Sequence, residues 1–324
     1  MSNMNLVEAV RSALDTEMAR DDDVLVMGED VGVDGGVFRA TDGLLEEYGE
    51  DRVIDTPLSE SGIVGTAVGL AVRGFRPVAE IQFMGFTYPA FDQVISHVSR
   101  IRNRSRGSYT CPMVVRAPYG GGIAAPEHHS ESTEALYAHV PGVKVAIPAT
   151  PSDAKGLLAS AIRDPDPVMF WEPKKVYRAF DEEVPDEEHT VPLGEANIVE
   201  PGEDITVIAW GAMLQVAKHA AEQVDASVEV VDLRSITPLD METISASVQK
   251  TGRVVIVHEA PKTCGVGAEV SATIAERTDD LFSLEAPIKR VTGPDTVFPL
   301  EKLEEVYLPG VDRVQQGIED TLAV

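Results

Sequence analysis

The sequence has few cysteines, little positive charge and no long apolar run. Its 324 residues include only two cysteines, Cys111 and Cys264, which are far apart and form no CxxC pair. Neither a disulfide framework nor a zinc site is therefore supported. No apolar run reaches the roughly 20 residues of a membrane span. Acids stand near the N-terminus where a signal peptide carries basic residues. We expect a cytoplasmic protein with no membrane partner.

Basic residues are outnumbered two to one by acids. The chain has 54 aspartates and glutamates against 27 lysines and arginines, and its net charge is -27. Such a surface repels the phosphates of nucleic acids, so we expect no nucleic-acid partner. Two interpretations of the acidity stay open. The chain is either an ordinary acidic enzyme or a protein adapted to high salt, where screening removes the self-repulsion, and we favour the second.

Apolar segments of strand length alternate with amphipathic segments of helix length along most of the chain. The pattern predicts, among others, a helix capped by Asn5, strands at residues 24–27 and 77–83, and helices at residues 89–104 and 152–163, the last capped by Ser152. Such alternation favours an α/β fold with mostly parallel sheets covered on both faces. We expect two three-layer domains, residues 1–180 and 193–324, joined by an acidic, proline-containing linker at 181–192.

The stretch from Arg52 to Arg76 reads as a strand, a loop and a glycine-containing helix with Glu60 at its head. An acid near a helix start is favoured by about 0.3 to 1 kcal/mol without any functional role. Each helical glycine costs roughly 1 kcal/mol against alanine, which close approach of another backbone would compensate. A structural and a functional interpretation of Glu60 are both open at this point.

Two adjacent histidines, His128 and His129, follow a glycine-rich strand end. Consecutive histidines are poorly placed to bind one metal ion. On a loop, an imidazole can give and take a proton near neutral pH, or it can simply be solvated. The glycines at 120–122 and after Cys264 fit neither the phosphate-loop nor the dinucleotide pattern. No GxSxG motif indicates a serine hydrolase.

Taken together, several segments are more specific than any of these motifs alone. IDTPLSESGIVGTAVGL, APEHHSES, VVDLRSITPLDMETI, VIVHEAPKTCGVGAEV and LEAPIKRVTGPDTVFP occur in this order along the chain. They closely resemble the beta subunit of the thiamine-diphosphate-dependent decarboxylating component of 2-oxo acid dehydrogenase complexes. The resemblance covers nearly the whole chain. It implies a pyrimidine-binding domain followed by a transketolase C-terminal-type domain.

The resemblance assigns roles to five residues. Glu60 matches the glutamate that shares a proton with the ring nitrogen of the cofactor's aminopyrimidine. Leu58 and Gln82 match residues beside that ring, and Phe86 matches the aromatic residue that stacks on it. His129, and not His128, matches the active-site histidine that is expected to stabilise the reacting adduct and to assist acyl transfer.

The resemblance also implies metals and partners. The family holds a structural potassium ion at positions that match Met113, Ala161, Ile162, Asp164 and Asp166. Asp166 stands where the family usually has asparagine. The family's GDG motif for magnesium and diphosphate is missing from this chain. An alpha subunit that holds Mg²⁺ and the diphosphate of a shared thiamine diphosphate is therefore implied.

The function implied is that of an α2β2 enzyme. It would decarboxylate a 2-oxo acid and transfer the acyl group to a lipoyl acyltransferase core, which residues 309–324 would help to contact. An acetoin dehydrogenase beta chain, a split transketolase-like subunit and a non-catalytic scaffold remain alternatives. The motifs HEAP, LEAP and IAWG look closer to the branched-chain type than to the pyruvate type. Sequence does not specify the 2-oxo acid, because the missing chain contributes to the pocket.

Overall fold

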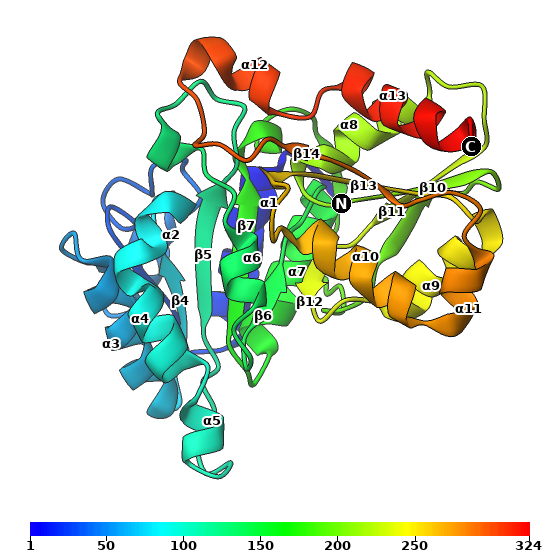
Figure 1. The fold of residues 1–324 in the computed structure, drawn as a ribbon. Helices are drawn as coiled ribbons and strands as arrows, with labels where there is room; N and C mark the ends of the chain where they lie inside the picture. Colours follow the sequence, from blue (N-terminus) through cyan, green and yellow to red (C-terminus); the bar gives the residue numbers. More distant parts are fainter.

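Two mostly parallel sheets form the frame of the protein, as the alternating pattern predicted (Figure 1). The computed structural model describes all residues 1–324. The first sheet has the order β12 (Ser235–Thr237), β6 (Lys144–Ala146), β7 (Val168–Pro173), β5 (Val114–Tyr119), β4 (Arg76–Glu80), β2 (Val24–Gly28) and β3 (Val53–Asp55). The second has the order β14 (Lys289–Gly293), β13 (Val254–Pro261), β10 (Ile205–Ala209), β11 (Val228–Asp232) and β9 (Asn197–Glu200). Within these two sheets, only β12 and β9 run antiparallel to their neighbours.

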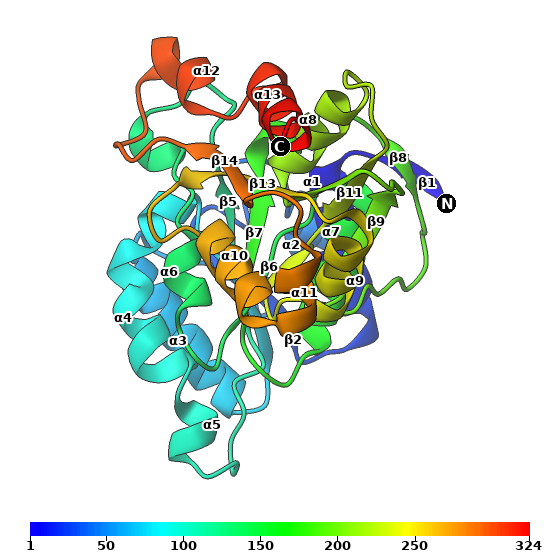
Figure 2. The same ribbon diagram turned by 45° about the vertical axis from the view of Figure 1, so that its right-hand side comes forward.

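Helices cover the faces of both sheets (Figures 1 and 2). Those of the first half are α1 (Leu6–Arg20), α2 (Leu44–Tyr48), α3 (Glu60–Val72), α4 (Phe91–Gln93), α5 (Ile101–Arg104), α6 (Glu134–Ala138) and α7 (Pro151–Arg163). Those of the second half are α8 (Ala212–Ala221), α9 (Met241–Thr251), α10 (Val266–Glu276), α11 (Thr278–Ser283), α12 (Glu304–Tyr307) and α13 (Val311–Leu322). Every residue of β2, β5 and β10 is buried, as expected for strands covered on both faces. None of the helices combines the length and apolarity needed to cross a lipid bilayer.

The starts of α1 and α7 test the predicted caps. Asn5 caps α1 in a reciprocal pair with Glu8, in which each backbone N–H donates to the other side chain. The predicted Ser152 cap of α7 is wrong. Thr150 is the cap, and its hydroxyl accepts a hydrogen bond from Asp153 N at 3.2 Å. Pro151 stands at the first helical position, where its missing N–H costs nothing, so the cap lies one residue before the proline.

The predicted helix at residues 89–104 is broken. The structure has a 3₁₀ segment at Met84–Ala90, then α4, a π-helical turn at Val94–Val98, and α5. Ser99 Oγ donates to the carbonyl of Ile95, within the π-helical region. Such side-chain bonds compete with the helical ladder and bend helices. The apolar spacing was read correctly, but the local hydrogen bonding prevents one regular helix.

The junction between the halves is more ordered than a simple linker. Glu182–Val184 forms a strand, β8, that pairs with β1 (Ser2–Met4) at the N-terminus. The strand β12 comes from beyond the predicted boundary but joins the edge of the first sheet through β6. A strand from the second half of the chain is therefore hydrogen-bonded into the first sheet. The division at residues 181–192 stays a prediction.

Candidate functional site

The predicted site residues lie on loops at the carboxyl ends of β2, β3, β4 and β5, which is where open parallel sheets place their sites. Glu60 is the first residue of α3 and is half-buried. Glu29 directly follows β2, and its pKa is raised by burial, by Asp30 and by Glu60. Two carboxylates therefore share one end of the site. Sequence reasoning did not assign a role to Glu29, although its position directly after a buried strand was an available signal.

His129 and Phe86 meet at the other end of the site. Their ring centroids lie 5.0 Å apart, edge to face, and Phe83 lies 4.5 Å from the imidazole in the same manner. The Nδ1 atom of His129 is buried and has no hydrogen-bond partner within the chain. His128 is exposed and lies beside Tyr88 instead. The two histidines therefore have different surroundings, and His129 is the one that the resemblance selected.

The two remaining predicted residues are Gln82 and Leu58. Gln82 follows β4, which ends at Glu80, two residues earlier than Gln82 and three before the predicted strand end. Its side chain donates to Asp30 at 2.9 Å. Leu58 precedes α3 and is 72% exposed. Helix α3 packs against the Met84–Ala90 segment, which carries Phe86. This packing connects the end of the site that holds Glu60 to the end that holds His129. The two side chains themselves form no hydrogen bond or ion pair with each other.

A buried lysine holds the histidine loop. Lys174 Nζ donates to the carbonyl of His129 at 2.5 Å and also to the carbonyl of Gly120. Burial lowers the pKa of Lys174 to about 8. The pKa of His129 is lowered by burial and then by the charges of Lys174 and His128, so its imidazole is neutral at neutral pH. Sequence reasoning missed Lys174, although a lysine after the fully buried strand β7 was a signal.

The glycine-rich loop binds carboxylates of the second half of the chain. Gly121 N donates to Glu259 Oε2 at 2.9 Å, and Gly122 N donates to Glu304 Oε1 at 2.7 Å. At Gly120, where φ is +81°, an added Cβ would lie 2.5 Å from the Glu259 carboxylate. The rejection of this loop as a phosphate site agrees with its contacts, because its N–H groups already have acidic partners.

Beneath these loops lies a buried ionic cluster. The guanidinium of Arg116, on β5, donates to Glu172 at 2.6 and 2.7 Å and also to Glu80. Tyr177 donates to the same Glu172 carboxylate at 2.6 Å. Breaking one partner of such a cluster leaves an uncompensated buried charge. The cluster therefore fixes the ends of β4, β5 and β7 under the site, and sequence reasoning did not identify it.

The residues predicted to hold potassium gather at the end of α7. The carbonyls of Ile162 and Asp164 accept hydrogen bonds from Arg76, at 2.8 and 3.4 Å, and the carbonyl of Met113 accepts one from Val168 N. The carboxylate of Asp166 pairs with Arg102. The charge of Arg76 would repel a cation at these oxygens. The potassium site stays a prediction, and we assign it no part in a reaction.

The rest of the site suits an aromatic, nitrogen-containing ring. It offers a half-buried carboxylate at a helix head, the ring of Phe86, the exposed side chain of Leu58 and the unpartnered Nδ1 of His129. These groups fit the aminopyrimidine of thiamine diphosphate. No group of three or more His, Cys, Asp or Glu side chains is placed to hold a metal ion.

Comparisons with known proteins agree with this architecture. Residues 2–179 match the family model described as transketolase, pyrimidine binding domain, and residues 194–314 match transketolase, C-terminal domain. A pyruvate dehydrogenase E1 component subunit beta of Staphylococcus aureus is 51% identical over 325 residues, which cover 99% of each chain. The subunit of the same name from Staphylococcus epidermidis is 52% identical, with the same coverage.

A solved structure described as split gene transketolase, inactive beta4 tetramer, superposes with a TM-score of 0.81 and covers 99% of each chain. At 22% identity, this likeness supports the fold alone. The acetoin dehydrogenase, split transketolase and scaffold alternatives are not favoured by the relatives at about half identity. The chain belongs to the family of E1 beta subunits of 2-oxo acid dehydrogenases, built from the transketolase pyrimidine-binding and C-terminal domains.

Proposed function

We propose that this chain is the beta subunit of an α2β2 pyruvate dehydrogenase E1 component. The enzyme decarboxylates pyruvate with thiamine diphosphate and transfers the acetyl group to a lipoyl group of an acyltransferase core. The observation that carries the proposal is the 51% identity to a pyruvate dehydrogenase E1 beta subunit across 99% of both chains. The contact between Phe86 and His129, and the position of Glu60 at the head of the helix α3, which packs against the segment that carries Phe86, support it.

In this proposal the chain's residues bind and orient the pyrimidine end of the cofactor. When bound, thiamine diphosphate supplies the electron sink for decarboxylation. Glu60 holds a proton at the ring nitrogen of the pyrimidine, and Phe86 and Leu58 flank the ring. The imidazole of His129 has a buried, unpartnered Nδ1, and in this proposal the ring gives or takes a proton during the reaction. The rings of Phe83 and Phe86 shield the imidazole from water.

The second half of the site is assigned to an alpha subunit, which holds Mg²⁺ and the diphosphate. Large apolar side chains are exposed on the loops around the site: Val33 is 81% exposed, Leu58 72% and Ile123 40%. Exposed apolar side chains gathered on one surface mark interaction sites. On α3, nothing in this chain lies within 4 Å of a Cβ added at Gly69. The close approach of another backbone that was expected at Gly69 is not made within this chain, and the proposal assigns it to a partner subunit.

Pyruvate is preferred to a branched-chain 2-oxo acid. Both relatives compared in detail are named for pyruvate, whereas HEAP, LEAP and IAWG alone suggested the branched-chain type. Co-expression with an alpha subunit, followed by decarboxylation assays on pyruvate, branched-chain 2-oxo acids and acetoin, tests the choice. We expect the highest kcat/KM for pyruvate, and no turnover by the beta chain alone. Turnover by the isolated chain would contradict the shared site.

The role of Glu60 is tested by Glu60→Gln in the assembled enzyme. The amide keeps the size of the side chain but cannot share a proton with the ring nitrogen as a carboxylate does. We expect kcat to fall by about 100-fold or more, within the range that general acid–base catalysis contributes. Glu46→Gln, an exposed change on α2, is the matched control and should leave kcat unchanged. Decarboxylation by the Glu60→Gln enzyme at the wild-type rate would remove Glu60 from the catalytic site.

A further inference from the structure

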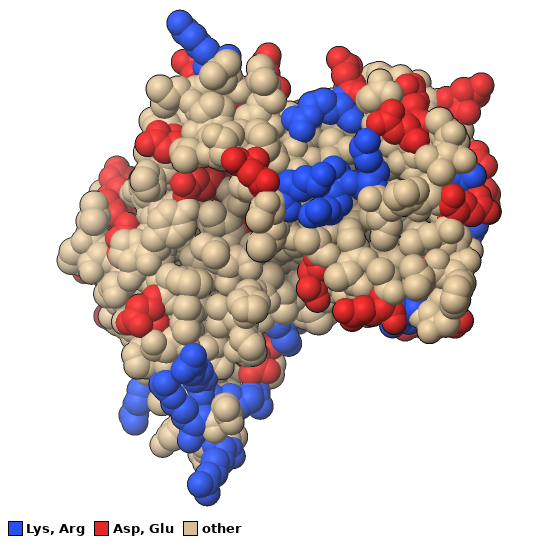
Figure 3. Space-filling view, in the orientation of Figure 1, with Lys and Arg blue, Asp and Glu red and all other residues tan.

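A hollow of about 450 Å³ lies in the second half of the chain, between β14, α13 and the loop that follows β13. Four of its twelve lining residues are basic, two are acidic and only Val291 is hydrophobic. The lining therefore carries an excess of two positive charges in a chain whose net charge is -27. Figure 3 shows basic side chains gathered on this part of the molecule, with acids around them. None of these residues belongs to the site of Glu60 and His129.

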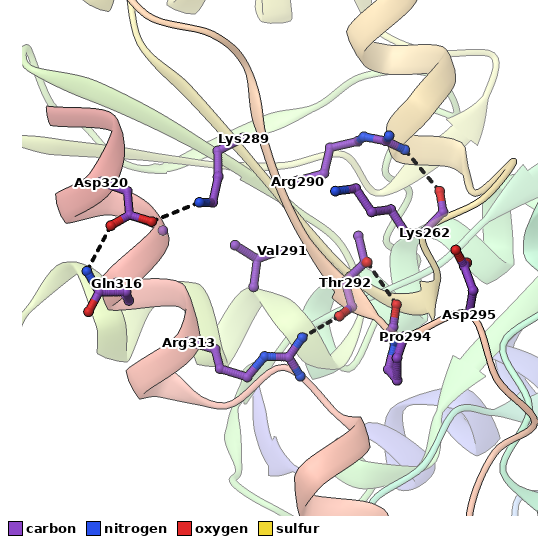
Figure 4. Close-up of a pocket in the computed structure, with 12 residues that line it drawn as sticks. Lys262, Lys289, Arg290, Val291, Thr292, Pro294, Asp295, Arg313, Gln316 and Asp320 are labelled. Carbon is purple, nitrogen blue, oxygen red and sulfur yellow. Dashed lines mark hydrogen bonds and ion pairs between the residues drawn. The ribbon is translucent and has the colours of Figure 1, made fainter. Parts of the chain in front are cut away.

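Three of the four basic side chains have no carboxylate partner. Lys262 is exposed, and its ammonium group makes no hydrogen bond or ion pair within the chain. Arg290 donates to the carbonyl of Lys262 at 2.9 Å, and Arg313 donates to the carbonyl of Thr292 at 2.6 Å (Figure 4). Carbonyl acceptors position a guanidinium without neutralising its charge, and each arginine has five N–H donors. The two guanidinium groups are therefore held in position, and no carboxylate neutralises their positive charges.

The acids of the hollow are already engaged. Asp320 pairs with Lys289 at 2.8 Å and accepts a second bond from Gln316 (Figure 4). Asp295 accepts hydrogen bonds from the backbone N–H and the hydroxyl of Thr263, at 2.8 and 2.7 Å. Neither carboxylate lies within ion-pair distance of Lys262, Arg290 or Arg313. The pKa of Asp295 is lowered mainly by its hydrogen bonds from Thr263 and to a smaller extent by the charge of Lys262. The two arginines and Lys262 therefore keep donors available for a ligand from solution.

We propose that this hollow binds a compact polyanion through Lys262, Arg290 and Arg313. The ligand class is a small molecule with two or more closely spaced negative charges, as in a phosphorylated metabolite or a di- or tricarboxylate. Guanidinium groups bind both kinds of oxyanion through paired hydrogen bonds. No aromatic residue lines the hollow, so it offers no ring on which a nucleotide base could stack. The volume of about 450 Å³ lies in the range of small-molecule sites.

The test uses the assembled α2β2 enzyme saturated with thiamine diphosphate and magnesium, so that the cofactor's diphosphate site is filled. Isothermal titration calorimetry with fructose 1,6-bisphosphate and with citrate, in KCl of constant ionic strength, measures binding by each class. Lys262→Gln removes one charge from an exposed side chain that makes no internal bond, so the variant should fold. Lys302→Gln, at an exposed lysine outside the hollow, is the matched control.

We expect one anion site per beta chain, with a Kd that rises about tenfold in Lys262→Gln, the effect of one lost charge-assisted hydrogen bond. Lys262→Glu should raise it further, and Lys302→Gln should leave it unchanged. Binding of the bisphosphate alone assigns the site to phosphorylated ligands, and binding of citrate alone assigns it to polycarboxylates. No heat with either anion would overturn the proposal, and so would an equal Kd in Lys262→Gln and the wild type. Either result is independent of pyruvate turnover.

Discussion

His129 is positioned through its main chain, because Lys174 donates to its carbonyl while Nδ1 of its ring has no partner. The same lysine lowers the pKa of the imidazole, after burial, which is the larger cause. A step that needs neutral imidazole loses rate as the pH falls through this lowered pKa. Lys174→Met removes a positive charge, so the pKa of His129 should rise and the acid limb of the kcat/KM profile should move to higher pH. We also expect kcat/KM at neutral pH to fall about tenfold or more as the loop shifts.

Two further variants separate positioning from general destabilisation. Lys174→Arg keeps the charge and the donor, so its acid limb should stay near that of the wild type. Lys175→Met makes the same change at the adjacent exposed lysine and should leave the limb in place. Melting temperatures measured in parallel report any loss of folding. If the acid limb of Lys174→Met coincides with that of the wild type, Lys174 does not set the titration of His129.

At the same scale, motif comparison assigned side chains that are expected to contact the cofactor, but it did not identify the residues that support their loops. Glu60 and His129 belong to short, specific segments, whereas Lys174 and Glu259 act on backbone atoms far away in sequence. Glu259 bonds to Gly121, which is 138 residues away in the chain. Contacts of that kind depend on how the two sheets meet. No spacing within a single segment reveals them.

Among the elements, α7 shows how local chemistry decides a boundary. Its cap is Thr150, and the proline that follows it fixes the first turn. Thr150→Ala should lower the free energy of unfolding by about 1 kcal/mol, because Asp153 N loses its partner. Ser152→Ala, at the predicted cap, should cost less, within about 0.5 kcal/mol. Thermal unfolding of both variants in one buffer provides the comparison, and an equal or larger loss in Ser152→Ala would restore the original assignment.

Element type was predictable where apolar periodicity and burial agree, as in α1 and β2. It was not predictable for the shortest elements. The strands β1, β8 and β12 have three residues each and depend on partners distant in the chain. The segment at 89–104 was predicted as one helix, but Pro89 lies in a 3₁₀ segment and Ser99 donates to the backbone carbonyl of Ile95, so the local geometry differs. Periodicity reports which face is buried and does not report which hydrogen bonds close the turn.

For the whole molecule, the sequence alone indicated the family but only one half of the active site. The loops that carry Glu60 and His129 end at a surface with exposed apolar residues such as Leu58. Nothing in this chain supplies the motif for magnesium and diphosphate. The proposed function therefore assigns the rest of the site to an alpha subunit, whose contribution cannot be read from this sequence.

The charge of the whole molecule leads to the last prediction. With a net charge of -27, the folded chain repels itself, and residues 181–188 concentrate exposed acids on one segment. Added salt shortens the screening length from about 10 Å at 0.1 M to about 3 Å at 1 M, so the repulsion should fade. We expect the melting temperature to rise between these KCl concentrations, by several degrees, as followed by circular dichroism. Replacing Glu183 and Glu187 by glutamine, where neither acid has an ion-pair partner, should reduce the rise because less charge remains to be screened. If the melting temperature is unchanged or lower at 1 M KCl, high salt does not stabilise the fold, and the chain is an ordinary acidic protein.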